Sequence, residues 1–144
     1  LREANQDDVS GILQLTMPLE EEGILAPRGQ DVIERDIARF SVIEHDRVLF
    51  GCAALFPFPN QVGELACLAV DSEVQGSGDG ERLLKHIELR AKAEGITKLF
   101  VLTTRTEHWF LKRGFVRATV DDLPAERKEI YNWDRKSMVL MKNV

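Results

Sequence analysis

The chain has 144 residues, of which 44% are hydrophobic, and its formal net charge is −5 at pH 7. This length and composition predict one domain over residues 1–144, because they suffice to bury a single core. The negative charge argues against a nucleic-acid partner, which requires a basic face. No apolar run approaches the roughly 20 residues that span a bilayer, and no signal peptide is evident. We therefore expect a cytoplasmic protein without membrane attachment.

The first forty residues predict two helices after a short initial segment, residues 2–4. Apolar residues recur at helical spacing over residues 9–19, and this helix ends near Gly23. A second short helix is predicted over residues 29–40, because one of its faces carries Val32, Ile33, Ile37 and Phe40.

The pattern then changes to one that is typical of strands. Residues 41–46 and 47–56 predict an antiparallel hairpin, joined by a polar turn at residues 45–47. Residues 63–70, with the sequence "GELACLAV", predict a further strand. This strand is apolar enough to lie centrally in a sheet.

The second half of the chain alternates helices with strands. A helix beyond residue 80 is predicted to stop at Gly95, and its apolar face carries Leu83, Leu84, Ile87 and Ala91. The later segments predict a strand over 98–104, a helix over 106–114, a strand over 115–120, a helix over 124–133 and a strand over 136–144. This order of elements indicates an α/β (α+β) mixture whose front half is largely antiparallel.

Three glycines at alternate positions, Gly76, Gly78 and Gly80, stand directly before the helix of residues 83–91, and we call residues 76–80 the glycine loop. Each glycine costs conformational entropy, so the loop either shapes a turn or lets a ligand approach the backbone. The first N–H groups of a helix are unpaired and favour an anion. A P-loop is excluded because no Gly-Lys-Ser/Thr is present. The dinucleotide fingerprint G-x-G-x-x-G does not match either, because the third glycine of this loop comes one residue too early.

The segment Gln75-x-x-Gly78-x-Gly80 after a strand ending in "LAV", together with "FLKRGF" at residues 110–115, resembles the GNAT superfamily of N-acetyltransferases. The resemblance implies a mixed sheet of six to seven strands, splayed at the acetyl-CoA site and flanked by about four helices. It also implies that loop amides hold the pyrophosphate of acetyl-CoA, without a metal. The residues expected to contact this co-substrate are Leu68, Val70, Gln75, Gly76, Ser77, Gly78, Asp79, Gly80, Glu81 and Phe110.

Further stretches resemble, essentially from end to end, the C-terminal acetyltransferase domain of bacterial N-acetylglutamate synthases. They are "PLEEEGIL", "ALFPFP", "GELACLAV", "LFVLTTRTEHWF" and "YNWDRKS". This resemblance implies acetyl transfer to the α-amine of L-glutamate, the first step of arginine biosynthesis. It also implies a longer, homo-oligomeric parent protein in which an amino-acid-kinase-like or lyase domain precedes this one. An acetyltransferase for another small amine and a non-catalytic acetyl-CoA-binding regulatory module are the alternatives.

Glutamate carries two carboxylates, so its site needs fixed cations, preferably guanidinium groups. The resemblance points to Arg28, to Arg135 with Ser137, and more weakly to Arg105. Arg135 and Ser137 are two residues apart, so they would face the same way in an extended strand. For any single arginine, the alternative is a solvated surface position.

The resemblance also suggests how the reaction proceeds, by direct attack of the amine on the thioester in a ternary complex. Glu64 corresponds to a general base, although a strand glutamate could also face solvent. Backbone N–H groups of Cys67 and Leu68 would contact the thioester oxygen. Cys67 has no evident His or Asp partner and is expected to be a buried thiol rather than a nucleophile. Phe110 stands where many relatives have an acid tyrosine, which leaves the proton donor open.

Overall fold

A computed structural model of the chain describes residues 1–74 and 76–144. Its helices are α1 (Val9–Glu21), α2 (Gln30–Arg35), α3 (Asp79–Ala93), α4 (Glu107–Leu111) and α5 (Ala125–Lys128). Its strands are β1 (Arg2–Glu3), β2 (Phe40–His45), β3 (Val48–Phe58), β4 (Val62–Val70), β5 (Lys98–Thr103), β6 (Val116–Ala118) and β7 (Met138–Asn143). None of the described helices is both long and apolar enough to cross a membrane.

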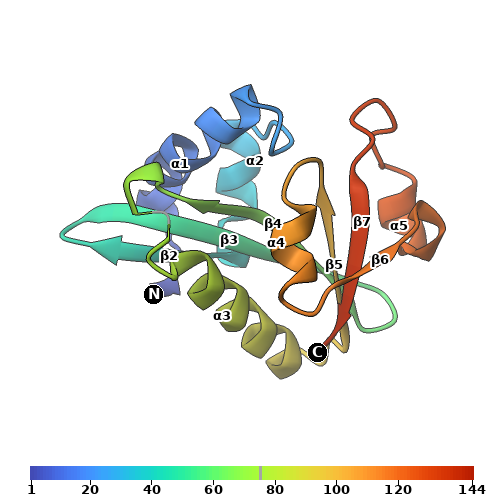
Figure 1. Ribbon diagram of the computed structural model, residues 1–144. Coiled ribbons are helices and arrows are strands. Elements are labelled where there is room, and N and C mark those ends of the chain that lie inside the picture. The colour runs from blue at the N-terminus through green and yellow to red at the C-terminus, as the bar shows by residue number, and fades with distance from the viewer. Residues whose placement is uncertain (75) are drawn as a thin grey trace.

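The strands form one mixed sheet in the order β1-β2-β3-β4-β5-β7-β6 (Figure 1). All neighbours are antiparallel except β4 and β5, which run parallel. The expected mixed sheet with an antiparallel front half is therefore confirmed. Successive strand residues point to opposite faces, so Val42 packs with α1 and α2 while Ile43 packs with α3. The sheet thus separates these two apolar cores, and a third cluster, which includes Phe100 and Tyr131, packs at β5 and β7.

Strands β4 and β5 diverge along their length, and this places the site. Their pairing joins only Val62–Glu64 to Lys98–Phe100, although β4 continues to Val70. On its other side β4 is bulged, because Cys67 and Leu68 stand opposite the single β3 residue Ala53. Cys67 has a φ of 55°, in the left-handed region that L-residues rarely adopt. A bulge of this kind leaves a residue outside the ladder and redirects its backbone groups.

The segment between α5 and β7 differs from its sequence-based expectation. The helix predicted over 124–133 ends at Lys128, and residues 133–136 form a turn in which Lys136 has a φ of 52°. The phenol of Tyr131 is buried and donates a hydrogen bond of 2.7 Å to the carbonyl of Ser137. Anchoring this ring in the core draws the chain out of the helix. The expectation that Arg135 and Ser137 lie on one extended strand is therefore wrong.

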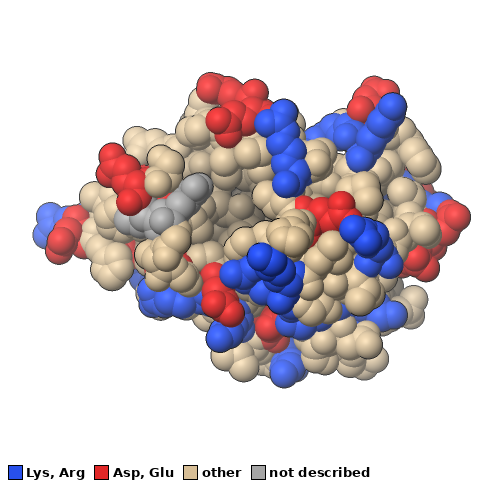
Figure 2. Space-filling model, viewed as in Figure 1, with Lys and Arg blue, Asp and Glu red and all other residues tan. Residues whose placement is uncertain are grey.

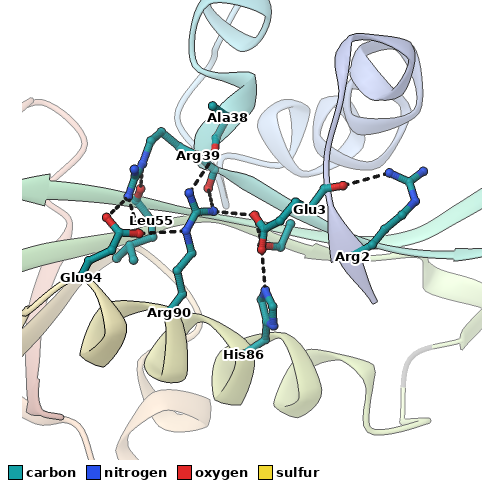
Figure 3. Close-up of polar contacts among 9 residues, drawn as sticks. Arg2, Glu3, Ala38, Arg39, Leu55, His86, Arg90 and Glu94 are labelled. Carbon is teal, nitrogen blue, oxygen red and sulfur yellow. Dashed lines mark hydrogen bonds and ion pairs between the residues drawn. The ribbon is translucent and has the colours of Figure 1, made fainter.

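An ion-pair network ties the short strand β1 to α3 (Figure 3). Arg90 donates to Glu3 at 2.8 Å, to Glu94 at 3.0 Å and to the carbonyl of Ala38 at 2.8 Å. Arg39 also donates to Glu94, at 2.9 Å. Strand β1 pairs over only two residues, and Glu3 adds a side-chain link from it to α3.

We expect the free energy of unfolding to fall as the pH drops below about 4.5, the ordinary pKa of Glu94. Burial acts to raise the pKa of Glu94, but hydrogen bonds from Arg39 and Arg90 outweigh it and lower this pKa. The pKa of Asp8 is also lowered, chiefly by its hydrogen bond from Arg2. Such carboxylates stabilise the fold above their unfolded-state pKa. That stabilisation is lost as the pH falls through the folded-state value.

Urea unfolding from neutral pH to about pH 3 measures this dependence. Glu94→Gln is expected to lower the stability at neutral pH by about 1 kcal/mol and to make the acid loss shallower. Glu126→Gln is the matched control, since Glu126 is exposed and has no ion pair among the described residues. An acid slope that stays the same in Glu94→Gln would contradict the assignment.

Candidate active site

A cavity of about 770 Å³ occupies the gap where β4 and β5 separate. Its walls come from the loop after α1, from β4, from the start of α3, from the end of β5, and from α4 and α5. Figure 2 shows the molecule hollowed near the centre of this face, with Lys and Arg side chains around the hollow. A volume of this size is typical of sites for cofactors and small molecules.

The glycine loop closes one end of the cavity. Gly76 and Gly78 have φ values of 89° and 90°, and a Cβ atom added at either would meet nothing within 4 Å. The open space, together with the left-handed backbone, accounts for glycine at these positions. Gly78 is the N-cap residue of the 15-residue helix α3, whose first turn therefore opens on the cavity. Free N–H groups and the helix dipole favour an anion there.

The other expected loop residues are placed less uniformly. Asp79, Gly80 and Glu81 line the cavity, whereas Ser77 is exposed and is not part of its lining. Asp79 is buried and forms an ion pair of 3.1 Å with Arg82, so its charge is balanced within the first turn of α3. The prediction for Gln75 lies outside the described residues.

The edge of β4 that faces β5 forms a long wall of the cavity. Leu68 and Val70 line it, as does Cys67 at the bulge. The β5 pairing ends at Glu64, so beyond this residue the same edge has no strand partner in the part of the chain that the structure describes. Backbone amides and carbonyls on such an edge are available to a bound ligand.

Glu64 is buried where the two strands separate. It is only 6% exposed, lines the cavity, and accepts a hydrogen bond of 2.8 Å from Nε of Arg127. The alternative of a solvated strand glutamate is therefore wrong. Sequence reasoning missed Arg127, which comes from the short helix α5, 63 residues along the chain, and belongs to no local motif.

Two of the four residues expected to bind the acceptor line the cavity, at the end formed by the loop after α1. The guanidinium of Arg28 lies 5.2 Å from the ring centroid of Phe56. Arg135 donates long hydrogen bonds to the carbonyls of Gly23 and Ile24, at 3.4 and 3.5 Å. Arg28 and Arg135 thus approach one cavity from sequence positions more than 100 residues apart.

Arg105 and Ser137 stand outside the lining of the cavity. Arg105 is nevertheless close to the same loop, since its Nη2 would be 4.0 Å from a Cβ atom added at Gly23. Ser137 is buried, and its carbonyl is engaged by Tyr131. These two residues therefore border the site without facing into it.

The remaining wall residues restrict the possible chemistry. Burial raises the pKa of the Cys67 thiol to about 11, so it remains protonated near neutral pH. Phe110 is buried between Trp109 and Phe115, with ring centroids 5.0 and 5.2 Å away, and offers no proton. Thr103, which no motif had indicated, lines the cavity and lies 2.6 Å from the hydroxyl of Thr106.

Comparison with known proteins agrees with this geometry. A family model described as an acetyltransferase (GNAT) domain matches residues 36–117. The chain belongs to the GNAT acetyltransferase family. This GNAT domain is 67% identical over its whole length to amino-acid acetyltransferase of Ralstonia nicotianae, and 51% identical over 99% of its length to that of Azotobacter vinelandii. It covers 32% and 33% of those proteins, so it spans about a third of the length of these relatives.

Among solved structures, the GNAT domain is similar to N-acetylglutamate synthase from Neisseria gonorrhoeae complexed with coenzyme A and N-acetyl-glutamate. The TM-score is 0.96 at 45% identity, over 99% of this chain and 34% of that one. The same enzyme complexed with coenzyme A and L-arginine gives a TM-score of 0.88 at 43% identity, over 99% of this chain and 32% of that one. The splayed sheet is therefore the GNAT fold in a closely matching form.

Proposed function

We propose that this GNAT domain transfers the acetyl group of acetyl-CoA to the α-amine of L-glutamate, giving N-acetyl-L-glutamate for arginine biosynthesis. One observation carries the proposal: a single cavity is lined both by the glycine loop at the start of α3 and by two arginines, Arg28 and Arg135. The similarity to a synthase complexed with coenzyme A and N-acetyl-glutamate supports the same choice of substrates.

Acetyl-CoA is the co-substrate at the end formed by the glycine loop. Its pyrophosphate is bound by N–H groups of residues 76–81 at the start of α3, where the helix dipole favours negative charge. Ser77 of this loop and the preceding Gln75 of the sequence motif are further proposed contacts of the co-substrate. The pantetheine chain lies along the unpaired edge of β4 at Leu68 and Val70, against Phe110. This route brings the thioester to the point where the two strands separate.

Glutamate occupies the opposite end, where Arg28 and Arg135 bind its two carboxylates. Guanidinium groups suit this role because they bind carboxylates with two parallel hydrogen bonds. The bonds that Arg135 now makes to backbone carbonyls are long, so they are readily exchanged for a carboxylate. Arg105 and Ser137 support this end of the site from outside the lining.

The reaction joins the two ends at Glu64. The amine nitrogen attacks the carbonyl carbon of the thioester, and its proton passes to the Glu64 carboxylate, directly or through one water. The oxygen gains negative charge and is stabilised by backbone N–H groups of Cys67 and Leu68 at the bulge. The C–S bond then breaks. Coenzyme A leaves as a thiolate, which needs no dedicated acid because thiols have a pKa of about 8.5.

The experiment measures thiol release from acetyl-CoA with glutamate, glutamine, aspartate, lysine and spermidine as acceptors. We expect turnover with glutamate to exceed that with every other acceptor. Turnover with lysine or spermidine, but not with glutamate, would overturn the acceptor and favour another small-amine acetyltransferase. Calorimetric binding of acetyl-CoA without turnover on any acceptor would instead favour a regulatory module.

A further inference from the structure

Arg113 is a fixed cation in the wall of the cavity, two residues beyond the end of α4. Its guanidinium stacks on the ring of Trp109, with its central carbon 3.9 Å from the ring centroid. Nη1 also donates a hydrogen bond of 3.0 Å to the carbonyl of the same residue. Stacking and hydrogen bonding together hold the guanidinium plane in one orientation.

Among the described residues, no carboxylate balances the charge of Arg113. Among the arginines that line the cavity, Arg127 is neutralised by Glu64. The other lining carboxylates are engaged by cations of α3, Asp79 by Arg82 and Glu81 by a lysine one turn away.

Within the described residues, Arg113 has no acidic partner, and its buried Nε–H has no hydrogen-bond acceptor. Unsatisfied buried donors are uncommon and cost free energy. The unpaired charge of this guanidinium in the cavity wall makes an anion its natural partner.

Trp109 places this cation at the end of the cavity formed by the glycine loop. A Cβ atom added at Gly80 would lie 3.3 Å from Cζ2 of Trp109 and 3.8 Å from a methyl group of Val70. The indole therefore packs directly on the first turn of α3, and Arg113 stacks on the same ring. Arg28 and Arg135 are assigned to the acceptor, so among the described residues Arg113 is the lining arginine without an ion pair that remains for the co-substrate.

We propose that Arg113 binds the ribose 3′-phosphate of coenzyme A and thereby selects acetyl-CoA over donors that lack this group. The inference rests on the acetyl-CoA site of the proposed function. The pyrophosphate is already served by the N–H groups of the glycine loop and α3, which leaves the 3′-phosphate as the group that needs a cation. A planar guanidinium suits a phosphate because it can donate two hydrogen bonds at once.

The test is calorimetric binding of coenzyme A and of 3′-dephospho-coenzyme A, which needs no acceptor and no turnover. The unaltered protein is expected to bind coenzyme A about tenfold more tightly. Arg113→Gln should abolish this preference by weakening the binding of coenzyme A alone, and Arg113→Lys should restore part of it. Lys112→Gln is the matched control, since it removes the same charge from an exposed neighbour outside the cavity lining.

Three outcomes would overturn the proposal. The first is an unaltered protein that binds both compounds equally. The second is an Arg113→Gln variant that loses affinity for both in parallel, which would indicate a pyrophosphate contact or a structural role. The third is an Arg113→Lys variant no better than Arg113→Gln. Because the readout is binding, a failure of glutamate acetylation leaves this test interpretable, and absence of any coenzyme A binding would refute the proposed function itself.

Discussion

Glu64→Gln is expected to lower kcat for acetyl transfer to glutamate by about 10²- to 10³-fold, with KM for acetyl-CoA changed by less than about threefold. The amide oxygen can still accept the hydrogen bond from Nε of Arg127, so the side chain keeps its position. What it loses is the ability to accept the proton of the attacking amine. The substitution thus removes proton acceptance while it keeps the position of the side chain in the site.

Steady-state kinetics with both substrates varied would measure this effect, well below the melting temperature of the variant. The temperature matters because glutamine leaves the charge of the half-buried Arg127 uncompensated, which costs stability. Glu44→Gln is the matched control. Glu44 is also a strand glutamate paired with an arginine, Arg2, but it lies on β2, away from the cavity. An unchanged kcat in a folded Glu64→Gln variant would exclude Glu64 as the base.

Arg135→Ala is expected to raise KM for glutamate by about a hundredfold, with KM for acetyl-CoA nearly unchanged. The reason is that the guanidinium contacts only the acceptor end of the cavity. Arg28→Ala should behave in the same way. Equal changes in the two KM values would remove Arg135 from the acceptor site.

Glutamine, which lacks the γ-carboxylate, identifies the partner of each arginine. Removal of the arginine that binds the γ-carboxylate should cost little further activity with glutamine. Removal of the other arginine should cost as much as it does with glutamate. Arg35→Ala is the control, because Arg35 is an exposed arginine of α2 outside the cavity lining. We expect it to change either KM by no more than about threefold.

The parts of this domain that the sequence could predict are those with local causes. The glycine loop is predictable because a few adjacent residues define both the spacing of its glycines and its position before a helix. The hairpin of β2 and β3 is equally local, and Asp46 and Arg47 in its turn have the positive φ values that such a turn requires.

Other features depend on packing between distant segments and have no local signal. The burial of Glu64 requires Arg127, which α5 brings from 63 residues away. The turn at Lys136 depends on where Tyr131 packs, and lysine gives no indication of a positive φ. Arg113 lies in the segment singled out for its Gly-Phe pair, but the sequence does not show that it lines the cavity. That position follows from the packing of Trp109 on Gly80 and of Arg113 on Trp109.

The short seam between β4 and β5 has a consequence for stability. Three residue pairs form the backbone pairing between β1–β4 and β5–β7, and side chains in the core shared with α3 supply further contact between these two parts of the sheet. A ligand in the cavity would contact residues of both β4 and β5 and so add contacts across the gap between them. We therefore expect a bound ligand to raise the free energy of unfolding of the domain as a whole.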